Sequence, residues 1–163
     1  MQLPLKIPAL TVWQPHAFAL AMGWKPVENR GSRLPLKPGD VLAIHAGKTV
    51  DKGVDFPENP ARSALWDAED EWDRTGCYPL LLRRSAVLCL VRFNGVHWSG
   101  DCSVRDEQGT SRCCTRWSGH GQFHHEVTLL HALAEPVPCS GQRGRWYLPG
   151  DVESAVRAQL EAK

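Results

Sequence analysis

The side chains best suited to chemistry are concentrated in one stretch of the chain, residues 11–48. Together with a later tryptophan, the candidates are Trp13, Gln14, Lys25, Glu28, Arg30, His45, Lys48 and Trp117. Proteins recognise unpaired bases with these residue types, because aromatic rings stack on a base, polar groups bond to its edge and cations hold the backbone. We therefore predict a site for RNA, another nucleic acid or a modified nucleobase.

Seven of the eight candidates have an expected role in that site. Trp13 or Trp117 would stack on a base, and Gln14 and Glu28 would bond to its edge. A carboxylate accepts a hydrogen bond from an exocyclic amine, so Glu28 favours cytosine, adenine or a modified relative. The cations expected to hold phosphate are Lys25, Arg30 and Lys48.

The same residues also allow an enzyme. Lys25 and Glu28 are the pair in this stretch that could share proton transfer in a hydrolase. A ribonuclease is a further possibility, with His16 or His45 as acid or base and Lys25 stabilising the transition state. A simple structural ion pair and satisfied structural histidines explain the same residues, so the sequence leaves catalysis open.

A metal site must also be weighed, because residues 99–125 contain several residues of the types that bind zinc. They are Cys102, Cys113, Cys114, His120, His124 and His125. No Cys-x-x-Cys pair is present, and the adjacent residues Cys113 and Cys114 cannot easily both bind one tetrahedral ion. The spacing therefore favours a long surface loop, and we predict no metal and no cofactor.

Short elements must position the candidate residues. Pro15 suits a first helical turn and Gly23 a helix end with positive φ, which predicts an apolar helix over residues 15–22. Residues 25–30 form a charged strand that Pro26 places at a sheet edge or a bulge. Residues 41–44 are continuously apolar and predict a strand buried on both faces.

The rest of the chain alternates helical and strand patterns. The expected elements are an amphipathic, acidic helix over 61–72, a strand over 85–93 ending at an Asn94-Gly95 turn, a strand over 126–133, a turn at 136–138, a strand over 145–148 and a helix over about 151–162. The acidic helix leaves a third class open, a protein-interaction adaptor.

Two groups of motifs carry a family resemblance. One is Trp13-Gln14-Pro15, then Gly23-x-Lys25-x-x-Glu28-x-Arg30, then a strand ending Ile44-His45-Ala46-Gly47-Lys48. The other is Pro136-Val137-Pro138-Cys139-x-Gly141, followed by Gly144-Arg145-Trp146-Tyr147-Leu148-Pro149. Together they resemble the ASCH domain (activating-signal-cointegrator homology domain) of the PUA-like superfamily. The resemblance implies an α+β fold, a PUA-like mixed β-barrel with a short helix after the first strand and peripheral helices.

The resemblance also implies binding of RNA or other nucleic acid in a cleft beside the first helix. One branch of the family resembles an amidohydrolase acting on N4-acetylcytidine, with a lysine at the position of Lys25. That branch has a threonine, the presumed nucleophile, at the position of Glu28. The glutamate here weakens the amidohydrolase alternative.

The length and composition of the chain limit the class of protein to which it can belong. With 163 residues, 42% of them hydrophobic, the chain is expected to form one domain over residues 1–163. No apolar run has the length of a signal peptide or a membrane span, so we expect a soluble, cytoplasmic protein with reduced cysteines. The net charge of +1 does not indicate nucleic-acid binding, although residues 11–48 hold five basic and two acidic residues. The oligomeric state is left open.

Overall fold

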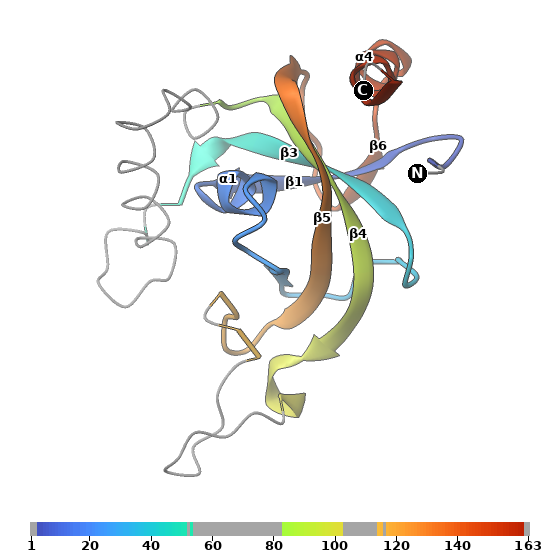
Figure 1. Cartoon of the computed structure of the whole chain (residues 1–163). Helices are drawn as coiled ribbons and strands as arrows, with labels where there is room; N and C mark the ends of the chain where they lie inside the picture. Colours follow the sequence, from blue (N-terminus) through green and yellow to red (C-terminus); the bar gives the residue numbers. More distant parts are fainter. Residues whose placement is uncertain (1–2, 52, 54–82, 103–113, 116, 162–163) are drawn as a thin grey trace.

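The computed structural model describes residues 3–51, 53, 83–102, 114–115 and 117–161, and these form one curled, mixed sheet with helices packed against it (Figure 1). The strands are β1 (Pro8–Gln14), β2 (Val27–Arg30), β3 (Val41–Val50), β4 (Ala86–Trp98), β5 (Phe123–Pro138) and β6 (Arg145–Tyr147). The helices are α1 (His16–Ala21), the short 3₁₀ helix η2 (Ser99–Asp101) and α4 (Gly150–Glu161).

The strand order across the sheet is β2-β5-β4-β3-β1-β6. β1 and β3 run parallel, and the other paired strands are antiparallel. A six-stranded, curled sheet of this kind with two α-helices in the described residues is an α+β half-barrel. This confirms the expected fold class. The strand β2 lies at one edge, where the proline before it is tolerated.

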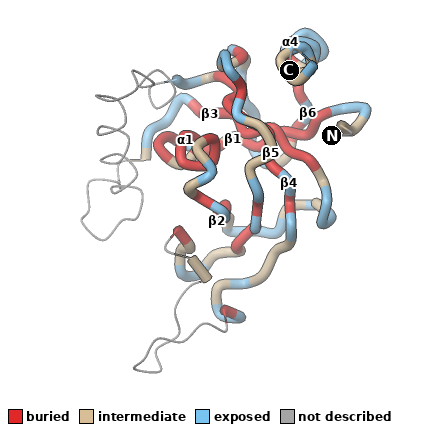
Figure 2. The backbone as a smooth tube through the Cα atoms, in the orientation of Figure 1, coloured by how far each residue is buried: buried red, intermediate tan, exposed pale blue. Residues whose placement is uncertain are grey.

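Two apolar cores lie on opposite faces of the sheet. Alternate residues of β3 divide between them, with Leu42 and Ile44 in one core and Val41 and Ala43 in the other. Side chains of a strand alternate between faces, so a continuously apolar strand must be covered on both sides. Helix α1 covers the first face and α4 covers the second, and Figure 2 shows α1 almost entirely buried.

The short helix α1 depends on this packing. Residues 17–21 are all buried, and the side-chain oxygen of Gln14 accepts a hydrogen bond of 3.0 Å from the backbone N–H of Phe18. A helix of six residues is marginal alone, so burial and this N-terminal bond hold it. Gly23 has φ of +73°, as expected just beyond the helix end.

Two predicted turns are wrong. The strand β4 continues through Asn94 and Gly95 to Trp98 as a bulge, and the Asn94 amide donates to the Thr128 hydroxyl at 2.9 Å. Likewise, β5 extends to Pro138 instead of ending near residue 133. In both places, pairing between β4 and β5 continues through the residues that suggest a turn.

Some expectations fall outside the described residues. The acidic helix expected over 61–72, and with it the adaptor hypothesis, lies there, as do all of residues 103–113, including the candidate metal ligand Cys113. Among the described helices, none is long and apolar enough to cross a membrane.

Candidate functional site

A cleft of about 700 Å³ opens beside α1. β1, α1 and β2 line it together with Lys25, residues 51 and 53, and a segment over 117–122. The cleft lies where the family resemblance places a ligand.

A buried cluster of charge lies in this cleft. The Lys25 ammonium donates to Glu28 Oε2 at 2.8 Å, and Arg30 Nε lies 3.0 Å from Glu28 Oε1. Arg30 also donates through Nη2 to the Thr11 carbonyl at 2.6 Å, which fixes its guanidinium against β1. Only 2% of the Lys25 side chain and 8% of the Glu28 side chain are exposed. Each carboxylate oxygen therefore faces one cation.

Local structure explains how these three side chains meet. Glu28 and Arg30 are two residues apart on β2 and share a face, as the strand period predicts. Lys25 precedes the strand, and its backbone N–H bonds to the Ala19 carbonyl near the end of α1. Lys25 lies outside the strand, so the alternation of strand side chains between two faces does not apply to it, and its side chain turns toward Glu28.

Electrostatics keeps Glu28 ionised. Burial alone would raise the pKa of this carboxyl, but Lys25 and then Arg30 favour the charged form and lower its pKa below the usual value. The site therefore presents a permanent carboxylate acceptor at neutral pH.

A second charged pair lies in the same cleft. His16 Nε2 and Asp51 Oδ2 are 2.8 Å apart, and the two side chains are about one quarter exposed. Burial would raise the pKa of Asp51, but the hydrogen bonds from His16 and from the Gly53 N–H, together with the charge interaction with His16, lower the pKa below its usual value. Asp51 also accepts from the backbone N–H of Gly53 at 2.9 Å. A histidine oriented by a carboxylate can accept or donate a proton.

Tryptophans flank the charges in two different ways. Trp13 is 54% exposed at the rim, so its ring is available to a ligand. Trp117 is 3% exposed and packs with Ala19 and Val27 in a small core. Asn29 fixes the segment that contains Trp117, donating to the Trp117 carbonyl at 2.7 Å and accepting from the Gly119 N–H at 3.2 Å. Trp117 therefore forms part of the cleft wall and also fills a small apolar core.

The structure brings five of the eight sequence candidates to the cleft lining: Trp13, Lys25, Glu28, Arg30 and Trp117. Gln14 is 2% exposed, and its amide bonds to the Phe18 N–H and to the Arg83 carbonyl. Lys48 is exposed but does not line the cleft. These two side chains are therefore placed differently from the expectation.

His45 is also placed away from the cleft. It is 1% exposed, lies edge-on against Trp146 and bonds through Nε2 to the Cys139 carbonyl at 3.0 Å. Burial lowers its pKa, so it stays neutral. This matches the alternative of a structural histidine, although only one of its ring nitrogens, Nε2, has a hydrogen-bond partner among the described residues.

Nine of the fourteen lining residues are not among the eight sequence candidates for the ligand site, and they include Asn29, Asp51, Ser118 and Gln122. Asn29 lies between the candidates Glu28 and Arg30 on the charged strand, and this neighbourhood is a sequence signal that could have identified it. Asp51 joins His16 across 35 residues of sequence, which no local pattern shows. Among the described residues, the one group of metal-ligand side chains, His97, Cys102, Cys114 and His124, lies outside this lining.

Comparison with known proteins identifies solved structures with a similar fold. No family model and no curated protein matches the sequence. A tyrosine-to-phenylalanine mutant of the ASCH protein of Zymomonas mobilis is similar in structure over 94% of this chain and 97% of that chain, with 12% identity and a TM-score of 0.52. The ASCH structure from the same organism without that mutation covers 94% of each chain, with 12% identity and a TM-score of 0.47. With the mixed, curled sheet, the first of these likenesses shows that this chain has the ASCH-domain fold.

Proposed function

We propose that this protein binds single-stranded RNA and holds one base, ordinary or modified, in the cleft beside α1. The observation that carries the proposal is the Glu28 carboxylate, which lines the cleft and is kept ionised by Lys25 and Arg30. A fixed acceptor beside an exposed aromatic ring is a combination suited to an unpaired base.

Glu28 has acceptor capacity left for a ligand. An ionised carboxylate offers about four lone-pair positions, and Lys25 and Arg30 each face one oxygen. An exocyclic amine of cytosine or adenine donates to such an oxygen, whereas a uracil carbonyl is repelled. The proposal therefore includes a preference for cytosine and adenine, which carry an exocyclic amine where uracil and guanine carry a carbonyl.

Lys25 has a different role from the one expected from sequence. Its ammonium is buried and bonded to Glu28, so it is poorly placed to contact phosphate. We assign it to holding the carboxylate. Trp13 is the stacking group, because its ring is half-exposed at the rim. Stacking on a tryptophan contributes about 1–3 kcal/mol per base.

The charges of the cleft lining are balanced. Lys25 and Arg30 are offset by Glu28 and Asp51 when His16 is neutral. The base would therefore contribute much of the binding energy, and phosphate contacts would come from outside the lining.

A hydrolase is the second candidate, and the His16–Asp51 pair favours it. In an enzyme this histidine would be the general base or acid beside the Lys25–Glu28 pair. Amidohydrolase chemistry would also need a nucleophile, such as a hydroxyl, close to Lys25. Within the part of the chain that the structure describes, the Lys25 ammonium donates to the Glu28 carboxylate and not to a hydroxyl. Binding is therefore the better supported function.

The test compares two exposed aromatic residues. Fluorescence anisotropy with short single-stranded RNAs of one base each would be measured for the wild type, Trp13→Ala and Tyr147→Ala. Tyr147 is 46% exposed and lines a different groove. We expect Trp13→Ala to weaken binding about 5- to 150-fold, as 1–3 kcal/mol implies, and Tyr147→Ala to leave it unchanged. Cytidine and adenosine oligomers should bind best.

Two results would overturn this proposal. One is RNA binding that is equally strong in both variants, and the other is no binding at low salt.

A second measurement tests the hydrolase. The same RNAs and N4-acetylcytidine would be incubated with the protein, recovered, and their masses measured by mass spectrometry. Products that disappear in His16→Ala would establish the hydrolase instead.

A further inference from the structure

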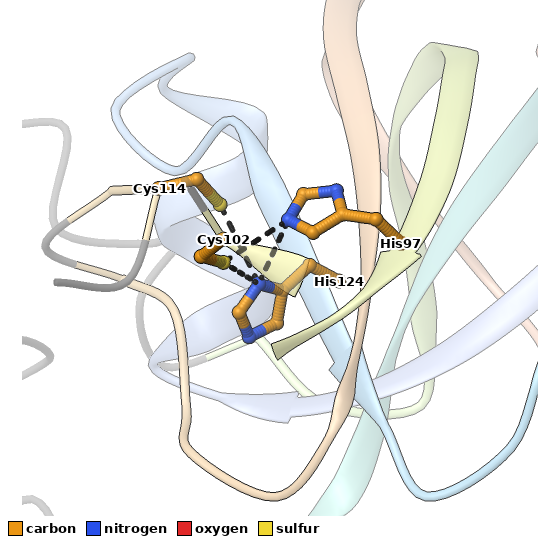
Figure 3. A group of neighbouring side chains, drawn as sticks. All are labelled: His97, Cys102, Cys114 and His124. Carbon is orange, nitrogen blue, oxygen red and sulfur yellow. Dashed lines mark hydrogen bonds between the residues drawn. The ribbon is translucent and has the colours of Figure 1, made fainter. Parts of the chain in front are cut away.

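Four metal-ligand side chains converge at the end of the β4–β5 ribbon (Figure 3). His97 lies on β4, Cys102 follows η2, Cys114 comes from the described pair 114–115, and His124 lies on β5. One donor atom from each residue lies within 4.8 Å of all the others. Residues from separate parts of the chain thus point their nitrogen and sulfur atoms at one position.

The donor spacing matches the edges of a tetrahedron around zinc. With Zn–N bonds of about 2.05 Å and Zn–S bonds of about 2.3 Å, tetrahedral donors are separated by about 3.3 Å (N to N) and about 3.5 Å (N to S). His97 Nε2 and His124 Nδ1 are 3.2 Å apart. The sulfur-to-nitrogen distances are 3.3 Å for Cys102 to His97, 3.5 Å for Cys102 to His124 and 3.4 Å for Cys114 to His124.

The outer ring nitrogens show which atoms are available as ligands. His97 Nδ1 lies 3.0 Å from the Glu126 carboxylate, and His124 Nε2 lies 2.7 Å from the Gly119 carbonyl. Both partners accept, so each of these nitrogens carries the proton. In the neutral rings, His97 Nε2 and His124 Nδ1 then hold lone pairs that face each other at 3.2 Å. Two facing lone pairs repel, and a cation between them removes the repulsion.

We propose that His97, Cys102, Cys114 and His124 bind one zinc ion through two nitrogens and two sulfurs. Soft thiolates with imidazoles in tetrahedral array select zinc among the common divalent ions. Each thiol would bind as a thiolate and release its proton to solvent. His124 and Cys102 are buried and His97 and Cys114 are partly exposed, so the site is shielded from water on one side and can be reached by an ion on the other. Four protein ligands fill a tetrahedral shell, which makes this a structural site and not a catalytic one.

The proposed zinc would fix one wall of the cleft. The Gly119 carbonyl that orients His124 belongs to a cleft-lining residue, and the Ser118 hydroxyl lies 3.1 Å from Cys114 Sγ. Asn29 holds the same segment from β2. The zinc proposal does not depend on which ligand the cleft binds.

The sequence expectation of no metal depends on spacing within residues 99–125. That segment omits His97, which precedes it on β4, and contains no Cys-x-x-Cys knuckle. The antiparallel pairing of His97 with His124 brings the two histidines together across the ribbon. Only one of the adjacent residues Cys113 and Cys114 is needed, so their adjacency is no obstacle to a tetrahedral site.

Metal analysis of the whole, reduced protein tests the proposal. After titration with Zn²⁺ and removal of excess, mass spectrometry of the metal content should give one zinc per chain. Co²⁺ in its place should give the absorption of tetrahedral, thiolate-bound cobalt. The variant Cys102→Ser/Cys114→Ser should lose both signals. The matched control is Cys139→Ser, a half-buried cysteine outside the group, and it should keep both.

A milder variant guards against misfolding of the double mutant. Glu126 is half-exposed and contacts the cluster through His97. Outer partners of this kind change metal affinity about 10- to 100-fold, so Glu126→Gln should weaken zinc binding by that factor in a chelator competition. Zinc bound at less than half an equivalent by folded wild type, or equally well by Cys102→Ser/Cys114→Ser, would overturn the proposal. Unchanged zinc affinity in Glu126→Gln would overturn the assignment of His97.

Discussion

The ammonium of Lys25 and the carboxylate of Glu28 lie 2.8 Å apart, and both side chains are buried. Neither charge can be removed alone without leaving the other in a site largely shielded from water. This pair therefore links the stability of the barrel to the chemistry of the cleft.

The first prediction concerns that pair. Lys25→Met should destabilise the protein by about 3 kcal/mol, because it removes one partner of a buried ion pair and leaves the Glu28 carboxylate with Arg30 alone in place of two cations. The double variant Lys25→Met/Glu28→Leu should be less destabilised than the single variant. Urea unfolding monitored by tryptophan fluorescence measures both. A Lys25→Met protein as stable as the wild type would contradict the geometry.

How far the sequence predicts this fold depends on the range of each signal. The buried strand at 41–44, the helix near the C-terminus and the positive φ of Gly23 follow from local patterns, and the structure confirms them. The Asn94-Gly95 signal is also local, but pairing with β5 over many residues overrides it. Strand length is set by the partner strand, which a local pattern does not contain.

The site residues also fall into two groups, those related by local sequence and those that meet only in the folded chain. Glu28 and Arg30 share a face because they are two residues apart on one strand. Trp13 and Gln14 are neighbours on β1, so they point to opposite faces, and only Trp13 lines the cleft. The sequence stretch alone does not reveal which of the two faces a ligand. His16 and Asp51, or His97 and His124, meet only through the tertiary fold.

The second prediction concerns salt dependence. If Lys48, exposed on β3, holds a phosphate as the sequence predicts, Lys48→Ala should weaken binding equally for all RNA sequences. It should also reduce the slope of log affinity against log salt by about 0.7. Trp13→Ala should leave that slope unchanged. Lys6→Ala is the control, since Lys6 lines a different groove. A slope that is the same in Lys48→Ala and the wild type would remove Lys48 from the interface.

The third prediction uses two glycines. A Cβ on Gly141 would contact His45 Cε1, and it would come within 2.5 Å of His45 Nδ1 and 2.6 Å of Thr11 Oγ1. Gly141→Ala should therefore cost about 1–3 kcal/mol through overpacking. A Cβ on Gly31 would meet nothing within 4 Å, so Gly31→Ala should be nearly neutral. Thermal unfolding of the two variants compares them directly, and equal melting temperatures would contradict the packing around His45.

The fourth prediction concerns pH. Burial lowers the pKa of His125 from its usual value, and its Nε2 accepts from the Leu34 N–H at 3.1 Å, so a proton there would break that bond. The folded state therefore binds a proton less readily than the unfolded state. The stability from neutral His125 should be fully present above about pH 6.5, the usual histidine pKa, and should be lost as the pH falls toward the folded value.

Imidazole NMR signals measure this directly. During an acid titration, the His125 ring should remain neutral at a pH where the histidines of the urea-unfolded protein are already protonated. A folded His125 that titrates together with the unfolded protein would show that its contact with Leu34 is not maintained in solution.

The last prediction separates the zinc site from the cleft wall. Asn29 bonds to the backbone of both Trp117 and Gly119 and is not one of the four proposed ligands. Asn29→Ala should leave two backbone groups without this partner, at a cost of about 1–3 kcal/mol. It should also weaken RNA binding, because the wall is no longer held from β2. The zinc content should stay at one per chain, since the ligands and their outer partners are intact. Loss of zinc together with RNA binding would instead show that Asn29 and the metal ligands hold this segment as one cooperative unit.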